Sequence, residues 1–414
     1  MKQAANSFDV IIVGGGMVGA SLALLLEPAI RRGLSVALID QFDLTAAQLQ
    51  QPSFDDRSSA LSQGSERILS KLGVWQQLSE TSPICHIQVS QQGQFGRVRL
   101  HSQEYNLDAL GSVVENRVLG RALAQQLTQL KQQTGNIQLL APAQVTKVAA
   151  NEQGYAVTLQ HGEQEKTSQA GLLIAADGAN SLICQQLGIT QHATSYQQDA
   201  IVANVAMDKP HEQWAYERFT SSGPLALLPM SQQRFALVWC MPPELSERRM
   251  TLTDIEFMAE LQQQIGFDKG ALQQVGKRQI YPLQKVQAQE QVRRGLVVLG
   301  NAAHALHPVA GQGFNLALRD AAQLAQQINT CWPRSISDLQ VLQSYAKAQS
   351  QDQWLTIQAS HWLPTGFAPT QLSVLRAIGL TMLDTMPVAK KLFARQAMGL
   401  VGKAQPWQPN TYLE

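Results

Sequence analysis

The sequence predicts an α/β protein with a Rossmann-like dinucleotide-binding domain, an interleaved β-sheet domain and C-terminal helices. Three observations support this class. Residues 8–39 show a buried strand, a glycine-rich turn, a helix and a second buried strand, which is the pattern of a βαβ unit. Strand-like alternation of apolar and polar residues recurs over 87–100 and 200–240. Beyond residue 332 the apolar spacing is helical.

Composition excludes several classes of protein. The 414 residues suffice for two or three domains, and the 44% hydrophobic content argues against disorder. A net charge of +1 makes nucleic acid a poor candidate partner. The four cysteines lack metal or redox spacing, so we expect reduced thiols and no metal site. No apolar run is long enough for a membrane span or a signal peptide, which indicates a soluble or peripheral cytoplasmic protein.

The predicted elements alternate between helical and strand-like spacing along the chain. The first βαβ unit ends at Asp40, after a helix that Gly33 terminates. The elements are strand 8–13, helix 20–32, strand 34–39, helix 58–72, strands 87–89 and 95–100, helix 117–130, a β-meander over 137–174, strands within 200–240 with a hairpin turn at 221–224, strand 296–299 and helix 313–327.

The glycine-rich turn carries the strongest chemical signal. Gly14, Gly16 and Gly19 form G-x-G-x-x-G between a strand and a helix, and Asp40 follows Gly19 by 21 positions. Such a turn admits a pyrophosphate at a helix N-terminus, while the carboxylate accepts a hydrogen bond from a ribose hydroxyl. The alternative is a purely structural turn. The pattern predicts a dinucleotide and leaves NAD and FAD open.

Two later segments resemble a known family. Strand-like residues precede both Asp177-Gly178 and Gly300-Asn301, and the latter is followed by Pro308 and Gly311-Gln312-Gly313. In this order the motifs resemble the group A FAD-dependent aromatic hydroxylases, and segments 54–61, 216–229 and 306–315 resemble their ubiquinone-biosynthesis members. Asn301 replaces the family's aspartate, although its amide oxygen can still accept a hydrogen bond. The resemblance implies a glutathione-reductase-like FAD-binding fold of the para-hydroxybenzoate-hydroxylase type.

The resemblance also implies an activity. NADH or NADPH, docking transiently, would reduce FAD, and a flavin C4a-hydroperoxide formed with molecular oxygen would hydroxylate a polyprenylated phenol. The expected substrate is 2-polyprenyl-6-methoxyphenol and the expected product is the 1,4-benzoquinol. A flavin-dependent reductase or oxidase of the same fold, acting on an isoprenoid, and a non-catalytic FAD-binding scaffold subunit are the alternatives.

The resemblance also bears on partners. Other ubiquinone-biosynthesis proteins are expected partners. An apolar stripe over 372–386 suits either peripheral contact with the inner face of the membrane or closure of the core.

We expect three parts along the chain. They are an FAD-binding domain from 1–75, 108–182 and 288–345, a substrate domain from 76–107 and 183–287, and a helical region from 346–414.

Several residues have two interpretations. Arg57 is expected to hold cofactor phosphates or the flavin, or else to pair with Asp55 or Asp56 at the surface. Asn116 either contacts the flavin or caps its helix. Tyr216 and Arg218 share one strand face, which lines the ring pocket or faces solvent. His304 and His307 are interpreted as structural.

The expected site residues form two sets. The cofactor-binding set is Gly14, Gly16, Met17, Gly19, Asp40, Arg57, Asn116, Asp177, Gly178, Gly300, Asn301, Pro308, Gly311, Gly313, Phe314 and Asn315. The catalytic set is Pro308, Arg57, Tyr216 and Arg218.

Overall fold

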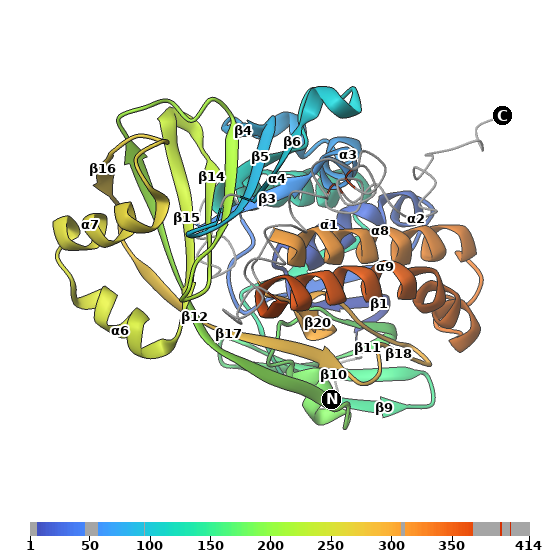
Figure 1. Cartoon of the computed structure of the whole chain (residues 1–414). Helices are drawn as coiled ribbons and strands as arrows, with labels where there is room; N and C mark the ends of the chain where they lie inside the picture. The colour runs from blue at the N-terminus through green and yellow to red at the C-terminus, as the bar shows by residue number, and fades with distance from the viewer. Residues whose placement is uncertain are drawn as a thin grey trace.

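A computed structural model of the chain describes residues 6–45, 57–94, 96–307 and 311–366, together with Lys390 and Met398. Three sheets make up its β structure, and two groups of helices pack against the two larger sheets (Figure 1). Pro308, the pair Asp55 and Asp56, and the stripe over 372–386 lie outside the described residues.

The first sheet is the dinucleotide-binding sheet that the sequence predicts. Its central strand β1 (Asn6–Val13) is apolar on both faces, because it runs parallel between two neighbours in a sheet that is covered on both sides. The strand order is β18 (Val292–Arg293), β19 (Leu296–Val298), β11 (Gln164–Ala175), β1, β2 (Val36–Ile39) and β8 (Ile137–Leu140), and the antiparallel hairpin of β9 (Gln144–Asn151) and β10 (Gly154–His161) extends from β11.

Helices cover one face of this sheet. Alternate residues of β1 divide between two cores, with Val10 and Ile12 packed under the helices and Ile11 and Val13 under the β9–β10 hairpin. The helices are α1 (Met17–Leu25), α2 (Glu27–Arg31), α3 (Gln63–Lys71), α4 (Asn116–Thr134), α8 (Gln312–Cys331) and α9 (Leu339–Gly366), while α5 (Leu182–Gln186) lies with the hairpin.

A nine-stranded sheet forms the other half of the molecule, at the left of Figure 1. Helices α6 (Pro243–Thr251) and α7 (Asp254–Ile265) cover its outer face, where Trp239 and Phe257 pack in the core. The strand order is β20 (His304–Ala305), β17 (Gln279–Ala288), β12 (Gln191–Met207), β15 (Arg234–Met241), β14 (Pro224–Pro229), β13 (Trp214–Phe219), β5 (His86–Gln91) and β6 (Arg97–His101), with β16 (Leu272–Val275) also paired to β12.

A small third sheet corrects one helix prediction. Residues 58–72 have helical spacing, yet the first five form β3 (Ser58–Ser62), antiparallel to β7 (Gly111–Glu115), which also pairs with β4 (Thr81–Ile84). The helix α3 starts only after Ser62, whose hydroxyl accepts from the Ser65 amide. Strand pairing with a distant segment therefore overrides local periodicity here.

Two further predictions need adjustment. The helix expected over 20–32 is divided at Leu26, because Pro28 follows and lacks the amide that would continue the hydrogen-bond ladder. The expected meander over 137–174 holds for β9, β10 and β11, whereas β8 is a parallel edge strand of the first sheet. Short 3-10 turns complete the fold: η2 (Trp75–Gln77), η3 (Ser102–Tyr105), η4 (Ser231–Gln233) and η5 (Gly300–Ala302).

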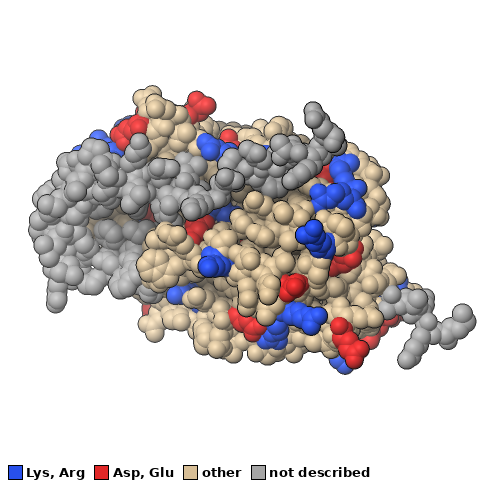
Figure 2. All heavy atoms as spheres, turned by 90° about the vertical axis from the view of Figure 1, so that its right-hand side faces the viewer, with Lys and Arg blue, Asp and Glu red and all other residues tan. Residues whose placement is uncertain are grey.

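The surface charges, the helices and the cysteines can be compared with what the composition implies. Acidic and basic side chains are interspersed on the face shown in Figure 2. None of the helices in the described ranges is long and apolar enough to cross a bilayer. All four cysteines are free thiols. Cys184 and Cys240 are buried, whereas Cys85 and Cys331 are partly exposed.

Candidate active site

A cavity of about 980 Å³ is lined by residues of all three sheets. This volume is at the upper end of the range of ligand pockets, about 300–1,000 Å³. Fourteen of the predicted cofactor-binding residues border it: Gly14, Gly16, Met17, Asp40, Arg57, Asn116, Asp177, Gly178, Gly300, Asn301, Gly311, Gly313, Phe314 and Asn315. The structure thus brings together motifs that are some 300 residues apart in the sequence.

The first glycine turn is packed too closely for side chains. Gly14 has a φ of +103°, and a Cβ on it would meet the Ala176 carbonyl oxygen at 2.2 Å. A Cβ on Gly19 would lie 1.8 Å from the carbonyl oxygen of Gly14. Gly19 does not border the cavity, so its role is the close packing of α1 against the turn.

The N-terminus of α1 opens on the cavity. Its N-cap, Gly16, supplies no side-chain cap, and its first turn carries no acidic residue. The Asp40 carboxylate accepts from the Gly15 amide at 2.6 Å and from the Phe42 amide at 2.8 Å. Asp40 therefore orders the turn while bordering the cavity, and the helix end presents amides suited to an anion such as a pyrophosphate.

The Asp177-Gly178 segment presents a buried acceptor. One Asp177 carboxylate oxygen accepts from the Ile183 amide at 3.3 Å. The other oxygen is buried and finds no donor among the described residues. Burial raises the pKa of Asp177, and a Cβ on Gly178 would meet no atom within 4 Å. An unpaired acceptor beside open space suits a hydroxyl or amide group of a bound cofactor.

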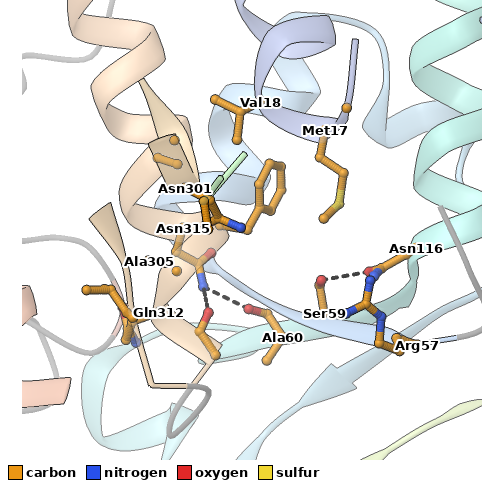
Figure 3. A pocket seen from close by; sticks show the side chains of 18 of the residues that line it. Met17, Val18, Arg57, Ser59, Ala60, Asn116, Asn301, Ala305, Gln312 and Asn315 are labelled. Atoms are coloured by element: carbon orange, nitrogen blue, oxygen red, sulfur yellow. Dashed lines mark hydrogen bonds between the residues drawn. The ribbon is translucent and has the colours of Figure 1, made fainter. Parts of the chain in front are cut away.

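A second helix end faces the same cavity. The N-cap of α8 is Gly311, with a φ of +60° and no side-chain cap, and Gly313 has open space beside it. Asn315 donates to the carbonyl oxygens of Ala60 and Gly311, both at 2.8 Å (Figure 3). Its own oxygen accepts from the Ser62 amide at 2.8 Å. Asn315 thus acts by positioning the start of α8.

Arg57 and Asn116 lie on the other side of the cavity in Figure 3. The Asn116 side-chain oxygen accepts from the Ser59 hydroxyl at 2.7 Å, and the backbone amide of Asn116 donates to the Arg57 carbonyl oxygen at 2.8 Å. The N-cap of α4 is Glu115, so the alternative in which Asn116 caps the helix is wrong. The Arg57 guanidinium carbon lies 4.7 Å from the centroid of the Tyr281 ring. Both residues border the cavity.

Replacing Arg57 with alanine is expected to weaken FAD binding by about tenfold to a hundredfold, since a hydrogen bond from a charged group contributes about 1.5–3 kcal/mol. The measurement is titration of the apoprotein with FAD, followed by flavin fluorescence. Arg97→Ala, on an exposed part of β6, is the matched control and should bind FAD as the wild type does. Unchanged affinity in Arg57→Ala would instead favour the surface ion pair.

Tyr216 and Arg218 share one face of β13, as predicted, but that face is turned away from the cavity. Tyr216 borders the cavity, yet its ring packs in the core between the nine-stranded sheet and helices α6 and α7. The ring centroid lies 6.2 Å from that of Phe235 and 5.0 Å from Lys269 Nζ. Burial raises its pKa to about 12. Arg218 Nε is buried without a partner in the described part of the chain. The geometry supports neither a solvent-facing pair nor a ring pocket built by these side chains.

Glu217, between them, is the residue that sequence reasoning missed. Ala215 and Phe219, which lie two residues to either side, border the cavity with it. The face of β13 that carries these three side chains therefore forms the floor of the cavity. Burial raises the pKa of Glu217 to about 8. The available signal was a single carboxylate on an otherwise apolar strand face.

A buried polar network supports the Gly300-Asn301 segment. His304 Nε2 lies 2.6 Å from an Asp320 carboxylate oxygen, and both side chains are buried. The other Asp320 oxygen accepts from Gln349 at 2.9 Å and from Gln353 at 3.0 Å. The interpretation of His304 as structural is confirmed, because it ties the segment after η5 to α8 and, through Asp320, to α9.

Comparisons with known proteins agree with this geometry. The FAD binding domain family matches residues 7–360. The chain is 35% identical to "Ubiquinone hydroxylase UbiL" of Rhodospirillum rubrum, over 94% of this chain and 89% of that protein. It is 29% identical to the "3-demethoxyubiquinol 3-hydroxylase" of Escherichia coli, over 95% and 98% of the two chains. The fold resembles p-nitrophenol 4-monooxygenase PnpA of Pseudomonas putida, with a TM-score of 0.76, 14% identity and coverage of 96% and 99%.

Proposed function

Because the chain belongs to the ubiquinone-biosynthesis hydroxylases, a family of FAD-dependent monooxygenases, we propose that it hydroxylates the aromatic ring of a polyprenylated phenol. The enzyme would consume O2 and NADH or NADPH. One oxygen atom enters the ring and the other leaves as water, so phenol, O2, NAD(P)H and one proton become quinol, NAD(P)+ and water. The proposed substrate is 2-polyprenyl-6-methoxyphenol, and the proposed product is the corresponding 1,4-benzoquinol.

A single observation carries this proposal: one continuous cavity joins the dinucleotide-binding turn to an apolar sheet floor. The turn and the ends of α1 and α8 provide backbone amides for a negatively charged cofactor. The floor provides apolar contacts for an aromatic ring and its prenyl chain, including Val202, Leu228 and Val238. Cofactor and substrate can therefore meet in one continuous space.

Each part of the site has a proposed role toward FAD. The amides at the start of α1 would hold the pyrophosphate, and Asp40 the ribose. Asp177, Asn116 and Arg57 would hold the flavin portion, and the positive end of α8 would favour negative charge on the reduced ring. When bound, FAD would supply the redox chemistry, because it can accept two electrons from NAD(P)H and pass them to O2. The protein would orient the phenol against the apolar floor, and the bound cofactor and substrate would displace water from the cavity.

We propose further that the enzyme works in the cytoplasm at the inner face of the membrane, in contact with other proteins of ubiquinone biosynthesis. A polyprenylated phenol is insoluble in water, which supports a peripheral location or delivery by a lipid-binding partner. The same insolubility makes a short-chain substrate the practical choice for testing the reaction.

The test is a two-step reaction with the purified holoenzyme. The protein is reduced anaerobically by NADH or NADPH and then mixed with O2 and a short-chain 2-prenyl-6-methoxyphenol. A hydroxylated ring is the expected result, and its substitution pattern identifies the position attacked. Flavin reduction without ring oxygenation would favour a reductase or oxidase of this fold. Tight flavin without substrate-stimulated NAD(P)H oxidation would favour a scaffold subunit.

A further inference from the structure

The floor of the cavity has one unusual member. Glu217 lies at the middle of β13, in register with Val89 of β5 on one side and Ala226 of β14 on the other. All three residues border the cavity. Among the residues that the described part of the nine-stranded sheet contributes to the cavity, Glu217 is the sole carboxylate.

The carboxylate has no structural partner that would account for its burial. No hydrogen bond or ion pair of the described residues involves Glu217, and the pKa of its carboxyl is raised by burial alone. The neighbouring Arg218 cannot neutralise it across the sheet, because successive side chains of a strand point to opposite faces. Glu217 is half-buried and borders the cavity. A largely desolvated carboxyl without partners destabilises a fold, so its place beside a cavity points to a ligand.

Other titratable groups face the same space from several elements. Arg57 borders the cavity from the segment before β3, and Tyr281 borders it from β17. Asp177 and His307 border it from the side of the first sheet and the loop after β20. Cys240 of β15 packs in the sheet, and its thiol pKa is raised by burial and by the charge of Glu217, so this thiol stays protonated. Glu217 is thus the group that the sheet itself offers as a proton acceptor.

We propose that Glu217 is a catalytic residue that accepts the hydrogen bond, and then the proton, of the substrate's ring hydroxyl. This inference rests on the proposed function and deepens it. The O–H bond of the phenol breaks, its proton moves to the Glu217 carboxylate, and the electron pair remains on the ring oxygen. The resulting phenolate is electron-rich at the ortho and para carbons, where oxygen transfer occurs.

The proton balance closes within the site. The attacked ring carbon gains a C–O bond, and when the ring regains aromaticity its hydrogen leaves as a proton that joins the second oxygen atom in the released water. The proton held by Glu217 then returns to the ring oxygen, which regenerates the carboxylate and releases the quinol. Molecular oxygen and NAD(P)H supply the oxidant and the two electrons, so Glu217 changes only the rate of ring attack.

The principal test compares Glu217→Gln with the wild type on the short-chain 2-prenyl-6-methoxyphenol. General-base catalysis contributes about 10²–10⁴-fold, so kcat for hydroxylation is expected to fall by about a hundredfold or more. Flavin content and anaerobic flavin reduction should stay normal, and NAD(P)H oxidation should become uncoupled from product formation. Glu165→Gln, on an exposed part of β11, is the matched control.

The pH profile separates a base from a merely structural residue. In the wild type, kcat/KM should rise as Glu217 loses its proton, with an apparent pKa near the value of about 8 that burial imposes. The Glu217→Gln variant should lack this limb and recover only as the phenol itself ionises, at about pH 10.

Thermal unfolding provides an independent readout of the buried carboxyl. Burial raises the pKa of Glu217 from 4.5 to about 8, so the folded state binds this proton more tightly than the unfolded chain. Its contribution to stability is fully present below pH 4.5 and is lost as the pH rises to about 8. The Tm of the wild type should therefore fall relative to that of Glu217→Gln across this window.

The outcomes distinguish this inference from the proposed function. If wild-type holoenzyme does not hydroxylate the phenol, the proposed function fails. If the wild type does so and Glu217→Gln keeps both its kcat and its pH profile, the role of Glu217 is overturned and the function stands. Should Glu217→Gln fail to fold, Glu217→Asp replaces it, and loss of the pH limb in this carboxylate-retaining variant would equally contradict the proposal.

Discussion

The Gly14→Ala variant is expected to lose its bound FAD. A Cβ at this position would lie 2.2 Å from the Ala176 carbonyl oxygen and 3.0 Å from the Asp177 amide nitrogen. The φ of +103° is also unfavourable for alanine. The turn must therefore shift, and it carries with it both the start of α1 and the Asp177-Gly178 segment, which border the cofactor cavity on two sides.

The measurement for Gly14→Ala is the flavin absorbance of the purified protein per chain, followed by titration with added FAD. Gly33→Ala is the matched control, because Gly33 has a φ of +100° and a Cβ there would meet no atom within 4 Å. This control shares the backbone strain without the clash and should retain its flavin. A Gly14→Ala protein with full flavin content would contradict the assignment of this turn to the pyrophosphate.

The Asp320→Ala variant is expected to be destabilised by about 3 kcal/mol or more, since each buried polar group left unpaired costs about 1–3 kcal/mol. The substitution removes the acceptor for His304, Gln349 and Gln353, all of which are buried. Because His304 follows the Gly300-Asn301 segment, the variant should also release its flavin at a lower temperature than the wild type.

Chemical denaturation followed by tryptophan fluorescence measures the stability of Asp320→Ala, and flavin fluorescence during heating measures cofactor release. Asp320→Asn keeps one acceptor oxygen and should be affected less. Glu163→Ala, at an exposed turn, should unfold as the wild type does. If Asp320→Ala matched the wild type in both measurements, the buried network would have no part in holding the cofactor segment.

Local patterns were sufficient for much of the fold. The strand, turn and helix over 8–32 were predictable because a parallel strand buried on both faces is a short apolar run, and the glycines that follow it have a backbone role. The hairpin turn between β13 and β14 was predictable for a similar reason, since Gly223 adopts a φ of +148°. By contrast, β3 was assigned to a helix because its partner β7 lies some 50 residues away.

The cofactor side of the site was also accessible from the sequence. Gly14, Asp40 and Asp177 each follow a strand of the same parallel sheet, and the carboxyl ends of parallel strands meet at one edge. Motif order therefore implied spatial proximity. The capping role considered for Asn116 was wrong, because the exact start of a helix depends on how the preceding strand is paired.

The substrate side depended on tertiary structure. Alternation in β13 placed Tyr216 and Arg218 on one face and Glu217 on the other, and this alternation does not tell which face is turned toward the cavity. That choice is made by α6 and α7, which cover the outer face, and by the three-stranded sheet, whose Ile84 and Val113 pack with Ala215 on the inner one. The sequence by itself determined the dinucleotide-binding fold, since its glycines and buried strands are local requirements of the backbone. Only the tertiary packing decided which face of β13, and so which of these side chains, lies toward the cavity, because the two faces of a strand differ solely in what lies against them.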